Sequence, residues 1–78
     1  MNTHRYTVTC HWDAEALVWY VAESDVPGLA TEADSLEAME AKLLDMIPEL
    51  LELNDPRAGH NAVPFELIAR KQETARFA

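Results

Sequence analysis

Apolar and polar residues alternate along the first part of the chain. The alternation runs from Arg5 to Trp12, and the side chains on its apolar side are Tyr6, Val8, Cys10 and Trp12. A period of two residues is typical of a strand with one face buried. The sequence therefore predicts a first strand over residues 5–12.

A second apolar segment follows a short polar interruption. Residues 13–16 are predicted to form a hairpin loop, and residues 17–23 are apolar almost throughout. Such a run indicates a second strand that is central in a sheet, or one whose second face is covered by another chain. Trp19 and Tyr20 point to opposite faces of this strand. We expect one of them to lie outside the core, and we take Trp19 as a candidate anchor of a protein interface.

Turn and capping residues separate the strands from a helical pattern. The Pro27-Gly28 pair is a strong turn signal, because proline fixes one φ angle and glycine adopts the positive φ that follows. Residues 29–31 are long enough for a brief third strand. Asp34 and Ser35 are the candidate N-caps of a helix. The turn and the candidate caps together predict a change from sheet to helix near residue 35.

The helical pattern buries one broad face. Apolar side chains cover about half of the circumference, which is wide enough to pack on a sheet. Pro48 lies within the pattern, and we expect a kink or a break there, because proline removes one helical hydrogen bond. The residues that share the apolar face are Leu36, Met39, Leu43, Ile47 and Leu50.

The last third of the chain completes one domain. Residues 54–61 have loop composition, and residues 63–70 alternate as a final strand, with Pro64 near its start. Residues 71–78 either extend that strand or fray. We therefore predict a single α+β domain over residues 1–78, in the order β-β-β-α-β. One helix packs on a three- to four-stranded, mainly antiparallel sheet.

The charge balance narrows the class of partner. The chain has 14 Asp and Glu against 6 Lys and Arg, a formal net charge of −8. Such a surface repels phosphates, so we expect no nucleic-acid binding by this chain. An acidic surface attracts a basic protein, or it serves only solubility. No apolar run approaches the length of a membrane span, and there is one cysteine, so we expect a cytoplasmic protein without membrane contact.

Catalytic and metal-binding patterns are not found. Cys10 and His11 are adjacent in a strand and point to opposite faces, which does not suit a zinc site. Cys10 shares the apolar face, so we expect a buried, unreactive thiol. The chain has glycine only at positions 28 and 59, and this spacing rules out a phosphate-binding loop. We predict no enzyme activity, metal or cofactor; a residual Mg²⁺-dependent nuclease would need the loop carboxylates to cluster.

The most distinctive polar feature is an acidic stripe on the outer face of the predicted helix. It consists of Asp45, Glu49 and Glu52. Asp45 and Glu49 are a like-charged i,i+4 pair, which destabilises a helix by a few tenths of a kcal/mol. The stripe is either a solvated surface or a docking surface for a basic partner. We take these three carboxylates, together with Trp19, as the candidate protein interface.

The order of these motifs resembles the HicB-like antitoxin family. The resemblance lies in Tyr6-Thr-Val-Thr, in Trp19-Tyr-Val-Ala, and in the segment from Asp25-Val-Pro-Gly to Asp34-Ser-Leu-Glu. It continues through the apolar helix to Ile47-Pro-Glu-Leu-Leu and covers about residues 4–70. The Val63-Pro-Phe-Glu-Leu ending resembles a short, single-domain branch of uncharacterised function.

The resemblance implies a non-enzymatic protein with a reduced ribonuclease H-like fold that lacks catalytic carboxylates. It implies binding and occlusion of a small basic toxin, HicA, which cleaves mRNA. Many HicB-like proteins carry a further DNA-binding segment, but only eight residues follow Arg70 here, so DNA binding is not expected. The alternative is a small structural homo-oligomer without a toxin partner. We expect self-association in either case.

Overall fold

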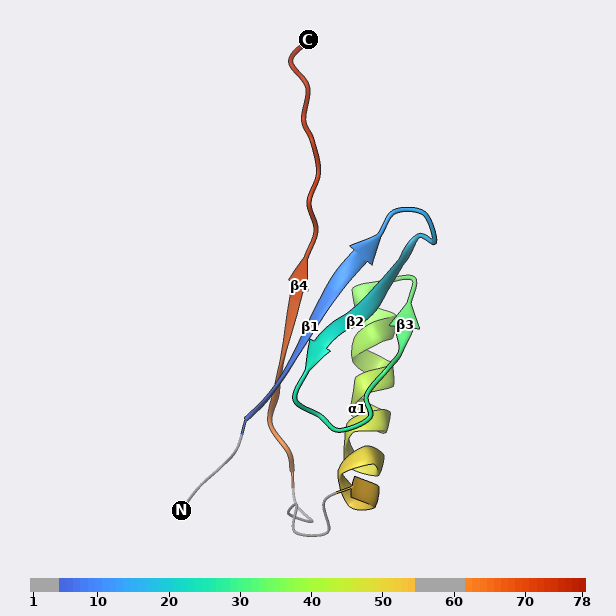
Figure 1. Ribbon diagram of the computed structural model, residues 1–78, viewed down its shortest axis with the longest axis vertical. Helices are drawn as coiled ribbons and strands as arrows, with labels where there is room; N and C mark the ends of the chain where they lie inside the picture. Colours follow the sequence, from blue (N-terminus) through green and yellow to red (C-terminus); the bar gives the residue numbers. More distant parts are fainter. Residues whose placement is uncertain (1–4, 55–61) are drawn as a thin grey trace.

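The computed structural model describes residues 5–54 and 62–78, which form one sheet and one helix (Figure 1). The predicted β-β-β-α-β order is confirmed. Most of the predicted loop over residues 54–61 lies outside the described residues, and Asn54 is the last residue of the helix. The elements are β1 (Tyr6–Asp13), β2 (Val18–Ser24), β3 (Glu32–Ala33), α1 (Leu36–Asn54) and β4 (Phe65–Arg70).

The four strands form a mixed sheet in the order β3-β2-β1-β4. β1 pairs with β2 and β2 pairs with β3 in antiparallel fashion, while β4 runs parallel to β1. The parallel pair requires a crossover, and the segment containing β2, β3 and α1 makes that connection. The α1 helix packs behind the sheet (Figure 1).

The third strand lies later in the sequence than the pattern predicted. The structure assigns β3 to Glu32–Ala33, not to residues 29–31. Gly28 has a positive φ of 75°, and the Leu29 amide donates to the Val26 carbonyl at 3.3 Å. This turn holds the chain away from β2, so pairing begins only where the Val21 amide donates to the Thr31 carbonyl, at 3.1 Å.

The hairpin between β1 and β2 is organised by one carboxylate. One carboxylate oxygen of Asp13 accepts hydrogen bonds from the amides of Glu15 (3.0 Å) and Ala16 (3.2 Å). Leu17 then takes a positive φ of 59°, and its amide returns to the Asp13 carbonyl at 2.8 Å. A positive φ is uncommon for leucine, and this conformation explains why β2 begins at Val18.

Ser35 is the cap of α1. Its hydroxyl oxygen accepts a hydrogen bond from the Ala38 amide at 3.0 Å, which satisfies one of the amides that a helix start leaves unpaired. The expected alternative of a break at Pro48 is wrong, since the helix is continuous from Leu36 to Asn54. Pro48 is exposed, so water can reach the carbonyl that lacks its amide partner. Any bend at this position stays a prediction.

The core lies between α1 and the sheet. Val8 and Cys10 of β1 are completely buried, as are Met39 and Leu43 of α1. The predicted burial of Cys10 is thus confirmed. Side chains from β4 and from the loop after β2 pack around this centre. The full buried cluster is Val8, Cys10, Val26, Ala33, Met39, Leu43, Ile47 and Leu51.

The C-terminal segment leaves the domain. Residues 71–78, here called the C-terminal arm, carry no strand pairing and every one of them is exposed. The arm extends beyond the sheet in the direction of β4 (Figure 1). The molecule therefore measures 55 Å along its longest axis but only 24 and 17 Å along the others. Its radius of gyration, 14.7 Å, exceeds the roughly 11.5 Å typical of a compact domain of this length.

Candidate interaction surfaces

The acidic stripe predicted on the helix lies on the surface. Asp45, Glu49 and Glu52 are all exposed on the side of α1 that faces away from the sheet. Glu37 and Glu40 are exposed on the same helix, so five carboxylates extend along it. The spacing of about 3.6 residues per turn places Glu37 and Glu40 on other sides of α1 than Asp45, Glu49 and Glu52, and we call these last three residues the acidic helix face.

The acidic helix face has little compensating positive charge. Lys42 is the one basic residue of α1, and its ammonium group donates to the Glu32 carbonyl at 2.6 Å. No carboxylate of the acidic helix face has an ion-pair partner within residues 5–54 and 62–78. The helix therefore presents a net negative potential to solvent.

Two leucines flank the carboxylates. Leu44 is 58% exposed and Leu53 is 80% exposed. A helix that only needs solubility would place polar side chains at these positions. Protein interfaces combine apolar side chains with neighbouring charges. Burial of the apolar groups supplies affinity, and the charges orient the partner.

The two aromatic residues of β2 have different surroundings. Trp19 is partly buried, packs against the core, and meets the Trp12 ring edge to face, with 5.4 Å between ring centroids. Tyr20 lies on the opposite face of the sheet, is 39% exposed, and contacts His11 at 6.1 Å between centroids. The prediction named Trp19 as the interface aromatic; the structure makes Tyr20 the more exposed of the pair.

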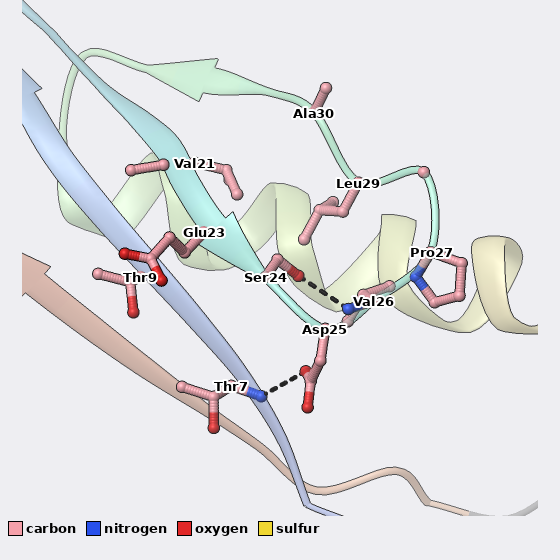
Figure 2. Close-up of a pocket in the computed structure, with 12 residues that line it drawn as sticks. Thr7, Thr9, Val21, Glu23, Ser24, Asp25, Val26, Pro27, Leu29 and Ala30 are labelled. Atoms are coloured by element: carbon pink, nitrogen blue, oxygen red, sulfur yellow. Dashed lines mark hydrogen bonds between the residues drawn. The ribbon is translucent and has the colours of Figure 1, made fainter.

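A groove opens between the end of β2 and the loop that follows it (Figure 2). It has a volume of about 910 Å³. Its position follows from the short β3, because β2 has no strand partner on that side beyond Val21. The apolar lining includes Val21, Val26, Leu29 and Ala30, and the polar lining includes Thr7, Thr9, Glu23 and Asp25.

Hydrogen bonds fix the polar rim of the groove. The Asp25 carboxylate accepts from the Thr7 amide at 2.9 Å, and the Ser24 hydroxyl accepts from the Val26 amide at 2.9 Å (Figure 2). The register of β1 and β2 also shifts here, since Thr9 and Cys10 pair with Glu23 and Val21. Ala22 is therefore an extra residue in β2. A bulge of this kind bends a strand and redirects its side chains.

The chemistry of the described residues is limited. Burial raises the pKa of the Cys10 thiol, because desolvation disfavours the thiolate. Within residues 5–54 and 62–78, no group of three His, Cys, Asp or Glu side chains is placed to hold a metal ion. In the same residues, α1 lacks an apolar stretch long enough to cross a membrane.

The fold and its surfaces define a small α+β domain with a single acidic helix, an open groove and a projecting arm. Residues 5–78 match the family model described as a domain of unknown function, DUF1902, and the chain belongs to that family. No curated protein matches the sequence.

One solved structure is clearly similar. It is the crystal structure of the hypothetical protein TTHA1013 from the extremely thermophilic bacterium Thermus thermophilus. The two sequences are 45% identical, with a TM-score of 0.69. The match covers 95% of this chain and 100% of the other, so the likeness extends over the whole domain.

Sequence reasoning missed the groove and the arm. The groove depends on where β3 begins, and a shift of three residues in that strand decides whether the edge of β2 is covered. For the arm, the sequence allowed two alternatives, extension of the last strand or fraying. Its one large apolar side chain, Phe77, was the available signal, because a phenylalanine in a polar tail has no core to join.

Proposed function

We propose that this chain is a non-enzymatic, HicB-like binding module, an antitoxin or a protein derived from one. Its acidic helix face binds a small basic RNA-cleaving protein and occludes the surface that this protein uses to bind RNA. The observation that supports the proposal is the unneutralised row of Asp45, Glu49 and Glu52, flanked by exposed leucines.

The physical argument is competition for positive charge. A protein that cleaves RNA binds the phosphate backbone with lysine and arginine side chains. A surface with a net charge of −8 attracts the same side chains over a distance of about one Debye length, roughly 8 Å at physiological salt. Leu44 and Leu53 then add apolar contact, which distinguishes a docked partner from a transient encounter.

Co-expression tests the proposal. The chain is produced together with the small basic protein encoded beside it, and cell growth and co-elution on sizing are measured. We expect the chain to relieve growth inhibition and to elute with the basic protein as one complex. The variant Asp45→Asn, Glu49→Gln and Glu52→Gln should weaken the complex by at least about tenfold, since rim charges mainly set the association rate.

A charge-matched variant controls for the loss of net charge. Asp34→Asn, Glu15→Gln and Glu66→Gln remove the same three charges from exposed positions outside the acidic helix face. This variant should bind nearly as tightly as the wild-type chain. Equal weakening by both variants, or the absence of any complex, contradicts the proposal.

The alternative function is a small structural homo-oligomer that has no toxin partner. The exposed C-terminal arm favours it, because a segment without contacts in its own domain is available to another copy. The two functions differ in one measurement. A structural oligomer assembles alone and leaves the toxicity of the neighbouring protein unchanged.

A further inference from the structure

The C-terminal arm is attached to its own domain only at its base. The Lys71 ammonium group lies 4.8 Å from the centroid of the Trp12 ring and 3.9 Å from the Glu73 carboxylate. Within the described residues, positions 74–78 take part in no hydrogen bond, ion pair or ring contact. Phe77 is fully exposed, at 103%. A phenylalanine held in water forfeits about 1.5–3 kcal/mol of burial free energy.

The arm and the groove lie at opposite ends of the same domain. Arg70, the last residue of β4, pairs with His11 near the β1–β2 hairpin. The groove is bordered by Thr7 and Asp25, at the other end of β1 (Figures 1 and 2). The arm points away from that end and does not contact the groove of its own chain (Figure 1).

We propose that the groove receives the C-terminal arm of a second copy of this chain. Phe77 of one copy packs against Leu29 and Ala30 of the other. Arg76 of the arm then lies beside Glu23 at the polar rim. Two copies related by a two-fold axis exchange arms in this way and form a symmetric dimer.

The direction of β4 makes the exchange geometrically consistent. β4 is an edge strand, paired with β1 alone. When two copies set their β4 strands antiparallel, the arm of each copy runs toward the groove end of its partner. The groove lies at β2, two strand spacings or about 10 Å across the sheet from β4, and the eight residues of the arm span about 26 Å when extended, so they can reach it.

Charge agrees with this occupant. The arm contains Lys71, Glu73 and Arg76, a net positive segment in a chain of net charge −8. Glu23 is exposed and has no ion-pair partner among the described residues.

Sedimentation of the full chain tests the exchange. We expect a dimer at micromolar concentration. Phe77→Ala should weaken the dimer about tenfold for each of its two sites, roughly a hundredfold together, because each site loses the burial of one aromatic side chain. Leu53→Ala is the matched control: it removes an apolar side chain that is 80% exposed on α1, and it should leave the dimer intact.

A charge exchange locates the arm in the groove. Arg76→Glu and Glu23→Arg should each weaken the dimer, and the two substitutions together should restore most of the loss. Ala30 is exposed and lines the groove, so the larger side chain of Ala30→Arg should block the arm and shift the equilibrium from dimer to monomer. Thermal unfolding of each variant, with Phe77→Ala as the reference monomer, separates loss of association from loss of folding.

Three results would overturn the proposal. The first is a wild-type chain that sediments as a monomer at 100 times the expected micromolar range, roughly 0.1 mM, where weak dimers still form. The second is a dimer that Phe77→Ala and Ala30→Arg leave unchanged, which places the interface elsewhere. The third is a folded pair of charge-reversed chains that fails to recover when the two substitutions are combined.

Discussion

At the scale of single residues, the structure separates groups that stabilise the fold from groups that are free to bind. Ser35 and Asp13 have their oxygens occupied by backbone amides, and Cys10 is completely buried. Glu23, Tyr20 and Phe77 face solvent. The sequence named Ser35, together with Asp34, as a candidate cap and predicted that Cys10 is buried, because capping and alternation are local properties that need no knowledge of the partner elements.

The buried thiol gives a prediction at this scale. Desolvation raises the pKa of Cys10, so the thiol stays protonated at neutral pH in the folded protein. We expect a thiol reagent at pH 8 to label the folded chain at least about a hundredfold more slowly than the urea-unfolded chain, because labelling requires opening of β1.

The pH dependence of stability follows from the same shift. A pKa that is higher in the folded state contributes stability below the unfolded value of about 8.5, and this contribution is lost as the pH rises through the folded value. Cys10→Ala should abolish the part of the alkaline destabilisation that the thiol causes, as measured by urea unfolding between pH 7 and pH 10. Rapid labelling of the folded chain would contradict the buried assignment.

At the scale of elements, the pattern predicted what periodicity controls and missed what tertiary contacts control. Helical spacing correctly placed Met39, Leu43 and Ile47 together on the buried face of α1, while Leu36 and Leu50 of the predicted face are half-buried. The position of β3 was predicted wrongly, because a strand of two residues is too short to show an alternation of apolar and polar side chains. The helix also continues through Pro48, because packing of its buried face outweighs one missing hydrogen bond.

Pro48 should lower the stability of α1. It is exposed, and its ring removes one hydrogen bond from α1 without contributing to the core. Pro48→Ala should therefore raise the free energy of unfolding, by up to about 3 kcal/mol if the helix can straighten fully. Urea denaturation with an unchanged m-value would measure the gain.

The control for Pro48 is a proline at a strand start. Pro64 precedes β4, and its carbonyl accepts a hydrogen bond from the Tyr6 amide at 3.2 Å. Pro64→Ala keeps that acceptor and should change stability by less than about 1 kcal/mol, through the unfolded state alone. A loss of stability in Pro48→Ala would show that the packing of α1 depends on a bend at this proline.

At the scale of the whole molecule, the sequence predicted net charge and fold class but not how the surfaces are distributed. The formal net charge of −8 follows from the composition. Only the structure shows that five carboxylates share α1, that Lys42 bonds to a backbone carbonyl, and that the C-terminal arm and the groove lie at opposite ends. Surfaces arise from residues distant in sequence, so a linear pattern cannot place them.

Clustered charge should make stability depend on salt. The acidic helix face carries like charges at helical neighbours, each such pair costing about 0.2–0.5 kcal/mol at low ionic strength. Raising NaCl from 20 mM to 0.5 M screens them, so we expect the melting temperature to rise by roughly 2–4 °C. The Phe77→Ala background keeps association out of the measurement.

The two charge variants show whether this salt response comes from α1. Neutralising Asp45, Glu49 and Glu52 should remove most of the rise, because it removes the neighbouring pairs 45/49 and 49/52 and leaves only the pair of Glu37 and Glu40 on the helix. The charge-matched variant, which is neutralised outside the acidic helix face, should retain the rise. An equal salt response in both variants would mean that net charge, rather than its concentration on α1, governs the electrostatics of this domain.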